Sequence, residues 1–199
     1  MVLNLNYDKL KQLTYQATHS AFLKAREDQG EEKIYTFSIC HSSLFRYFIP
    51  LYNTEQALKK AAKKYIQHHP NDYSDIEEVS KLIRWNPGDW QYLADDDNIF
   101  YEINEILQDV PERLDELDEL EFTLTCQLLE DILFTALSEL NSAEVFGTGN
   151  ERNSLVITIT TLGGDTTRQL EIVQKLNPPE VYKKFREEIV WRELYIQSR

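Results

Sequence analysis

Cysteine is scarce in this sequence of 199 residues, which contains only Cys40 and Cys126. The two lie far apart, form no Cys-x-x-Cys pair and stand in apolar surroundings. A disulfide framework of the kind found in small secreted proteins is therefore not expected. The sequence predicts instead two buried, unpaired thiols in a reducing compartment.

Long apolar runs are absent as well. No stretch approaches the roughly 20 apolar residues that a helix needs to cross a bilayer. The first residues, Met1-Val2-Leu3-Asn4-Leu5-Asn6, lack the basic region and the apolar core of a signal peptide. We therefore expect a cytoplasmic protein that makes no contact with a membrane.

Basic residues are outnumbered. Lys and Arg total 21 and Asp and Glu total 34, so the formal net charge is 21 − 34 = −13. Nucleic-acid binding depends on neutralising phosphates with Lys and Arg, so this balance argues against a nucleic-acid partner. A basic protein, such as a toxin, is the kind of partner that the charge would suit.

Signatures of catalysis and metal binding are also missing. His19 has no second ligand three or four residues away, and the adjacent His68 and His69 would point about 100° apart on a helix. The aspartates at 95–97 lack the alternating ligands and the glycine of a calcium loop. The loop 146–150 has two glycines but leads into a strand, unlike a phosphate-binding loop. We expect no catalytic residue, no metal site and no cofactor.

The apolar pattern predicts one α+β domain, in which a small antiparallel sheet packs against several helices, including one long central helix. Apolar residues make up 42% of the chain, enough for a core in a single domain of this length. The predicted elements are a helix capped by Asn6, a hairpin of strands at 34–40 and 45–52, a helix at 57–67 capped by Asn53, a strand at 154–160, and helices at 166–176 and 181–195.

The longest predicted element is one helix from Asp109 to Leu140, with an apolar stripe that includes Leu128 and Ile132. Its first half is crowded with carboxylates, and Arg113 is the single opposing charge there. This acidic face is either solvated or a docking surface for a basic partner, whose association the charge would speed. The docking candidates are Asp115, Glu116, Asp118 and Glu119.

Two of the three tryptophans lie in the stretch Arg84-Trp85-Asn86-Pro87-Gly88-Asp89-Trp90. Pro87 fixes φ for the second position of a β-turn, and Gly88 can supply a positive φ at the third, so we predict a type II turn. The residue before a proline prefers extended backbone, and residues 82–85 are predicted to be extended as well.

Two interpretations of this turn remain open. In one, it is a corner of the core, with Arg84 and Asp89 paired or Asp89 acting as a cap. In the other, it forms a small-ligand or enzymatic pocket in which Arg84 binds an anionic group, Asp89 orients it, and Trp85 and Trp90 stack on it.

Several motifs follow one another along nearly the whole chain. They are Asn53-Thr54-Glu55, Arg84-Trp85-x-Pro87-x-Asp89-Trp90, Phe146-Gly147 followed by Arg152 and a strand, and Leu176-Asn177-Pro178. In this order they resemble domain of unknown function 4303 (DUF4303), a family of mostly bacterial proteins. The resemblance implies one α+β domain and no established activity. Gly88 stands where the family is expected to carry cysteine, which argues against thiol chemistry at the turn.

The sequence thus leads to two main hypotheses of function. The first is a non-enzymatic protein-binding or accessory protein with an acidic docking face, similar to an immunity protein that neutralises a toxin. This analogy comes from the resemblance, and a family does not fix a function. The second is a small-ligand or enzymatic pocket at the tryptophan turn. A purely structural subunit of a complex is a third possibility, and the oligomeric state stays open.

Overall fold

The structure, a computed structural model, describes residues 3–93, 98–161 and 164–198. The strands that it describes form a four-stranded sheet in the order β3-β2-β1-β4. They are β1 (Ile34–His41), β2 (Phe48–Thr54), β3 (Tyr92–Leu93) and β4 (Val156–Thr161). The α+β class is confirmed, but the sheet is mixed, since β1 is antiparallel to β2 and parallel to β4. Parallel pairing needs a long crossover, and residues 42–155 provide it.

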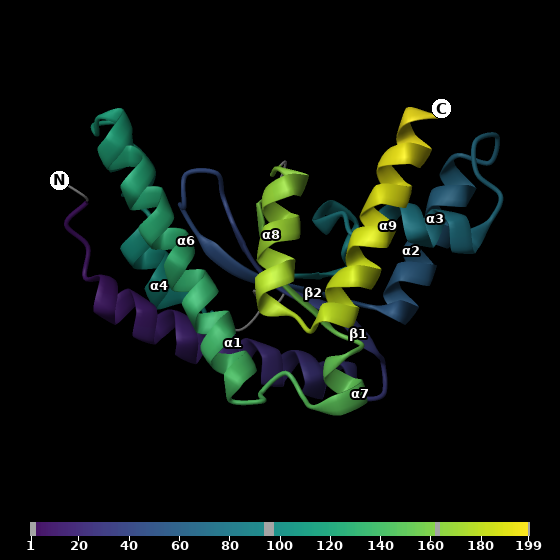
Figure 1. Cartoon of the computed structure of the whole chain (residues 1–199), viewed down its shortest axis with the longest axis horizontal. Coiled ribbons are helices and arrows are strands. Elements are labelled where there is room, and N and C mark those ends of the chain that lie inside the picture. Colours follow the sequence, from purple (N-terminus) through teal and green to yellow (C-terminus); the bar gives the residue numbers. More distant parts are fainter. Residues whose placement is uncertain (1–2, 94–97, 162–163, 199) are drawn as a thin grey trace.

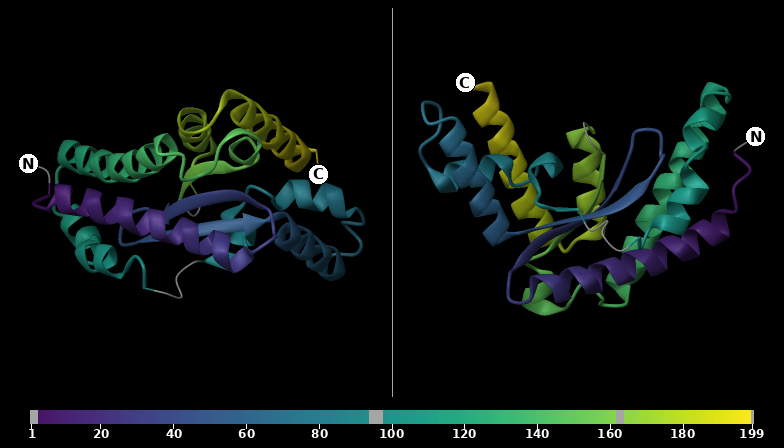
Figure 2. Two further views of the ribbon diagram at one scale, coloured as in Figure 1. Left: turned by 90° about the horizontal axis from the view of Figure 1, so that it is seen from below. Right: turned by 180° about the vertical axis from the view of Figure 1, so that it is seen from behind.

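Helices surround this sheet (Figure 1). They are α1 (Tyr7–Gln29), α2 (Glu55–His68), α3 (Ile76–Ile83), α4 (Tyr101–Leu107), α5 (Val110–Leu114), α6 (Glu119–Ser142), α7 (Gly149–Arg152), α8 (Thr166–Leu176) and α9 (Pro179–Gln197), with a short 3-10 turn η1 (Pro87–Asp89). Figures 1 and 2 show α6, α8 and α9 in a row, with α1 crossing the end of α6. Within the described residues no helix is both long and apolar enough to cross a membrane.

Side-chain caps set where several helices begin. Asn6 accepts a backbone N–H group at the start of α1, as the sequence predicts, and Asp165 does the same at the start of α8. At α2 the cap is Thr54, whose Oγ1 accepts the Ala57 N–H at 3.0 Å, so the predicted cap Asn53 is wrong. Asn53 is the penultimate residue of β2 and is buried there. The aspartates at 95–97 lie outside the described residues.

The predicted long helix is present as α6, but it does not begin at Asp109. The short helix α5 ends at Leu114, and Asp118 then caps α6 by accepting the Glu121 N–H at 2.8 Å. Asp118 itself has extended backbone (ψ 167°), so α5 and α6 are separate helices.

The predicted stripe along this helix is only partly buried. Leu120, Leu124 and Leu128 are 69%, 43% and 39% exposed, whereas Ile132 is buried as predicted. Each step of four residues advances 400° around a helix, so a row spaced by four drifts about 40° per step. The row therefore begins on the solvent side and reaches the core only at its far end, and the neighbouring Leu129 faces the core.

The buried side chains of the sheet belong to two main clusters. Ile157 and Ile159 of β4 pack with Phe37 in a cluster that α1 and α6 complete. Val156, the neighbour of Ile157, belongs to a second cluster together with Trp85. Because neighbouring residues of a strand point to opposite faces, β4 is covered on both sides. The tryptophan turn therefore packs against the sheet together with α9, which also contributes to the second cluster.

Candidate functional site

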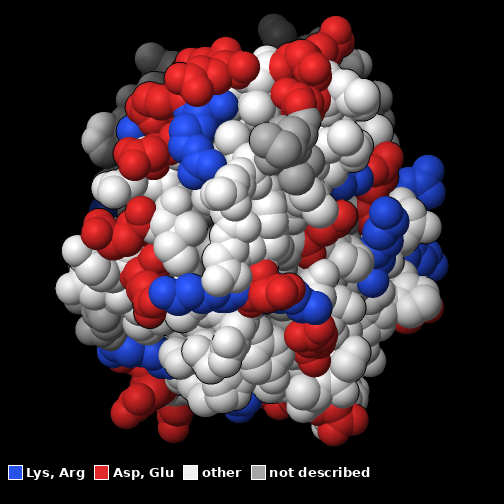
Figure 3. Space-filling view, turned by 90° about the vertical axis from the view of Figure 1, so that its left-hand side faces the viewer, with Lys and Arg blue, Asp and Glu red and all other residues white. Residues whose placement is uncertain are grey.

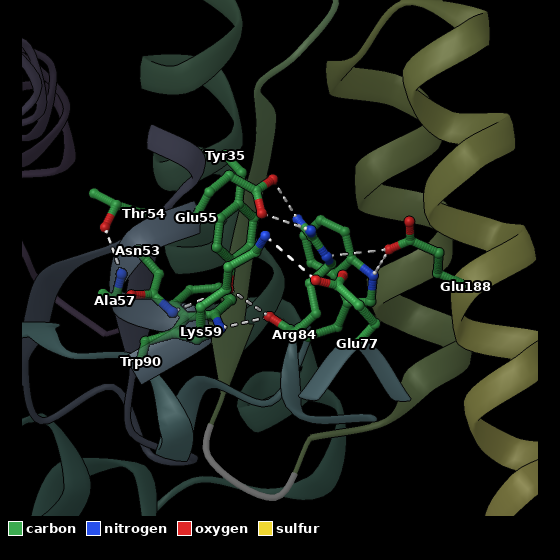
Figure 4. Close-up of polar contacts among 11 residues, drawn as sticks. Tyr35, Asn53, Thr54, Glu55, Ala57, Lys59, Glu77, Arg84, Trp90 and Glu188 are labelled. Carbon is green, nitrogen blue, oxygen red and sulfur yellow. Dashed lines mark hydrogen bonds and ion pairs between the residues drawn. The ribbon is translucent and has the colours of Figure 1, made fainter. Parts of the chain in front are cut away.

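Arg84 directly follows α3, and carboxylates from two other helices bind its side chain (Figure 4). Its Nη1 and Nη2 donate to the two oxygens of Glu55, at the start of α2, at 2.9 and 2.8 Å. Its Nε lies 3.6 Å from Oε2 of Glu188 on α9. Such a bidentate pair fixes the geometry of a guanidinium as well as its charge. The positive charge of the turn is therefore neutralised within the protein.

The backbone carbonyl of Arg84 is equally well satisfied. It accepts the O–H of Tyr35 and the indole N–H of Trp90, each at 2.9 Å. The Tyr35 hydroxyl in turn accepts an N–H from Asn53 at 3.0 Å, and the guanidinium lies 4.5 Å from the centre of the Tyr35 ring. Burial raises the pKa of Tyr35 well above its ordinary value, so its hydroxyl stays a donor. These contacts form a closed polar network around Arg84.

The two tryptophans point into different parts of the core. Trp85 donates its indole N–H to Glu188 at 2.7 Å and packs against Phe185 with ring centres 4.8 Å apart. Trp90 belongs to a small cluster with Cys40 and Leu51. The indoles therefore do not stack on each other, and both rings are almost wholly buried.

The backbone of the turn differs from the prediction. Residues 82–83 are the end of α3 rather than extended chain, and Gly88 does not have a positive φ. Residues 87–89 form a 3-10 turn, since Pro87 also fits the first position of a helical turn. Of the two alternatives for Asp89, the pairing with Arg84 is wrong: Arg84 binds Glu55, and Asp89 accepts an N–H from Asn86 at 2.6 Å. Arg84 and Asp89, the groups that the pocket hypothesis assigned to a ligand, both have partners inside the protein.

A second network surrounds Arg152, which is only 7% exposed. Its Nε donates to Asn141 at 2.6 Å, and its Nη2 donates to the carbonyl of Leu176 at 2.8 Å and to Asn177 Oδ1 at 3.1 Å. Asn177 also bonds both backbone groups of Ile157 in β4. All these partners are neutral, and burial lowers the pKa of Arg152 to about 10. The network ties α7 and the α8–α9 junction to the sheet.

The four sequence motifs therefore meet in pairs. Residues 53–55 contact the Arg84 stretch, and Arg152 contacts residues 176–177. A family model described as domain of unknown function (DUF4303) matches residues 14–178. The chain belongs to the DUF4303 family. No curated protein and no solved structure matches the chain. Helix α9 begins at Pro179, beyond the matched residues, yet it supplies Glu188 to the first network.

In this DUF4303 protein a pocket of about 220 Å³ lies beside the tryptophan turn. Residues 85–87 of the turn, residues 159–161 at the end of β4 and the start of α8 line it. Glu130 of α6 and Arg192 of α9 complete the lining. Parallel strands β1 and β4 both end at this side of the sheet, at His41 and Thr161.

His41 does not line the pocket itself but forms a hydrogen bond with Thr161, which does. Its Nδ1 is 2.8 Å from the carbonyl oxygen of Ser42, which can only accept, so Nδ1 carries the proton. Burial lowers the pKa of His41, which keeps the ring neutral, and its Nε2 then accepts the Thr161 O–H at 2.9 Å. The ring stacks on Phe45 with centres 4.3 Å apart. His41 therefore orients Thr161. Within the described residues no group of His, Cys, Asp or Glu side chains could hold a metal ion.

The four predicted acidic candidates lie at the α5–α6 junction and the start of α6, and all are exposed. Asp118 is the helix cap, while Asp115, Glu116 and Glu119 form no ion pair with any described residue. Residues 114–151 contain ten Asp and Glu and no Lys, Arg or His. Figure 3 shows carboxylates gathered along the upper margin of the molecule, the end at which α6 begins.

Sequence reasoning missed two features. The exposed leucine row of Leu120, Leu124 and Leu128 continues directly from the acidic candidates, but its spacing suggested burial. The drift of a four-residue spacing was the signal that could have revealed it. Arg192 carried no local signal, because only the packing of α9 against the turn brings it to the pocket.

Proposed function

We propose that this DUF4303 protein is a non-enzymatic binding protein that docks a basic protein partner on the first half of α6. One observation carries the proposal: the exposed row of Leu120, Leu124 and Leu128 begins beside carboxylates that no described cation neutralises. Apolar side chains at the centre with charges at the rim are the usual composition of a protein interface.

The carboxylates and the leucines of this surface have different roles in binding. Exposed carboxylates attract a basic partner over a distance of about 8–10 Å at physiological salt, and they raise the association rate. The leucines supply the apolar contact that holds the complex once it has formed, because burying apolar area is what sustains most protein association. The partner should therefore combine lysines or arginines with an apolar face.

The proposal extends to a role like that of an immunity protein, with a basic toxin as the partner. Two arguments support this extension. Proteins of this general kind often resemble immunity proteins, which is an analogy, and the acidic surface is complementary in charge to a basic toxin. We also place the protein in the cytoplasm. Cys40 and Cys126 form no disulfide within the described residues, which suits a reducing compartment.

The alternative hypothesis, a ligand or enzymatic site at the Arg84–Trp90 turn itself, has less support. A ligand anion would have to displace Glu55, which binds both Nη atoms of Arg84. The cost of separating a partly buried ion pair makes such an exchange unfavourable.

The test compares two variants of equal charge. Asp115→Asn, Glu116→Gln and Glu119→Gln together remove three carboxylates from the docking surface and spare the cap Asp118. The matched control combines the same type of change at three exposed glutamates elsewhere, Glu27, Glu187 and Glu193. Each protein is used to retain partners from the source cell at low and high salt. The retained protein is identified, purified and titrated against all three forms.

The proposal predicts that the parent and the control bind the same basic protein, and that the surface variant binds it at least tenfold more weakly. Added salt should weaken binding of the parent. Leu120→Gln should also weaken binding, whereas Leu194→Gln, at a similarly exposed leucine of α9, should not. Equal binding by the two triple variants, or a purified partner that is acidic, would refute the proposed surface.

A further inference from the structure

Acidic residues outnumber basic ones by 34 to 21 in this chain, so a basic side chain without an acidic partner, such as Arg192, is unexpected. It lines the pocket beside the tryptophan turn, yet it forms no hydrogen bond or ion pair with any described residue. Its Nε is shielded from solvent, and therefore from anything in the pocket, so only its two Nη groups could contact an occupant.

The other charges of the pocket are already matched. Arg168 binds Glu130 across the pocket and Glu171 on its own helix. Asp165 caps α8 by accepting the Thr167 N–H at 2.9 Å. Arg168 is therefore neutralised by protein carboxylates, and Arg192 is the cation in the described lining that lacks a counter-charge.

Asp89 of the turn is a carboxylate on which the positive charge of Arg192 acts. Burial raises the pKa of Asp89, an effect that the Asn86 N–H and the positive charge of Arg192 oppose. Asp89 is nevertheless not within ion-pair distance of Arg192, and its Oδ2 accepts from Asn86. Asp89 thus leaves the guanidinium of Arg192 without a direct partner.

Polar groups around this guanidinium favour an oxygen-rich occupant. The pocket is also lined by the hydroxyl-bearing Thr166 and the amide-bearing Gln169 of α8. Its volume of about 220 Å³ is below the roughly 300–1,000 Å³ of pockets for drug-sized ligands. A nucleotide or a peptide would not be enclosed, whereas a small acid would be.

We propose that the pocket binds a small oxyanion, the carboxylate or phosphate group of a small metabolite, with Arg192 as its principal charged contact. The hydroxyl of Thr166 and the amide of Gln169 complete its shell of donors. Guanidinium groups suit both carboxylate and phosphate because their N–H groups match pairs of oxygens. This site is separate from the acidic docking surface, and its occupant is a small molecule rather than a protein.

The test measures thermal unfolding of the full chain with inorganic phosphate or with acetate, each against chloride at equal ionic strength. Phosphate and acetate distinguish a phosphorylated ligand from a carboxylic acid. The site variant is Arg192→Gln, and the control is Arg186→Gln, an exposed arginine of α9 that does not line the pocket. Both variants remove one positive charge from the same helix.

At about ten times the dissociation constant, mass action should raise the unfolding temperature of the parent by about 3–6 °C with at least one probe. Arg186→Gln should keep this shift and Arg192→Gln should lose it. Without any probe, Arg192→Gln should unfold within about 2 °C of the parent, because it removes a donor that has no partner. A parent that responds to neither probe beyond chloride, or an Arg192→Gln variant that responds like the parent, would overturn the proposal.

Discussion

Leu128 and Leu129 are neighbours on α6, and the structure predicts very different results for the same change in each. Leu129 is 0% exposed, and Leu128 is 39% exposed. Truncating a fully buried leucine to alanine removes its transfer free energy and leaves a cavity, which together cost about 2–5 kcal/mol. Leu129→Ala should therefore lower the free energy of unfolding by about 3 kcal/mol.

Leu128→Ala leaves no enclosed cavity, since solvent reaches the position. Full burial of a leucine is worth about 1.5–3 kcal/mol, and alanine replaces only part of a side chain that is incompletely covered. Alanine is also slightly the better helix former. We therefore expect a loss of about 1 kcal/mol or less.

Urea denaturation of the two variants, followed by circular dichroism, measures this difference directly. The comparison is internal, because both changes remove the same atoms from adjacent positions of one helix. The gap between the two free energies should exceed about 1 kcal/mol. If Leu128→Ala proved as destabilising as Leu129→Ala, the placement of the exposed leucine row, and with it the docking surface, would be wrong.

Three further predictions follow from the structure. Gly88→Ala should be neutral or mildly stabilising in urea denaturation, whereas Gly147→Ala should lower the free energy of unfolding by about 1–2 kcal/mol. Of these two glycines, Gly147 has a positive φ (90°) and Gly88 does not. Equal effects would contradict the observed turn. Burial lowers the pKa of His41, so its contribution to stability is full above about pH 6.5 and is lost as pH falls through that value towards the folded pKa; the urea midpoint of the parent should fall more between pH 7.5 and 5.5 than that of His41→Gln. In native protein a thiol reagent should label the half-buried Cys126 before the buried Cys40, but more slowly than a free thiol, because burial raises the pKa of Cys126; faster labelling of Cys40 would refute this order.

Much of the fold could be predicted because its signals are local. Asn6 and Asp165 cap helices from the residue before the first turn, and the capping contact depends only on the next two or three residues. The strand that became β4 stood out by its run of β-branched residues, which fit a pleated and buried surface. The mixed pairing of the sheet had no such signal, because the partner of β4 lies more than a hundred residues earlier in the chain.

The candidate site was harder to predict because tertiary contacts decide it. Pro87 is compatible with a type I, type II or 3-10 turn, and the sequence around it does not choose between them. Here the carbonyl of Arg84, just before the turn, accepts hydrogen bonds from Tyr35, which is distant in sequence, and from Trp90, which directly follows the turn. The acidic candidates, in contrast, were correctly expected to be exposed, since unpaired carboxylates are rarely buried.

The network at the turn and the pocket beside it are linked through α9. Glu188 accepts the indole N–H of Trp85 and lies 3.6 Å from Nε of Arg84, so the network fixes the rotation of α9 about its axis. Arg192 is four residues further along, and residues so spaced share one face of a helix. The contacts that hold Glu188 against the turn therefore also direct Arg192 towards the pocket. The tryptophan turn is thus a corner of the core whose own polar groups are bonded within the protein. Through α9 it also positions Arg192, the candidate binding group of the neighbouring pocket.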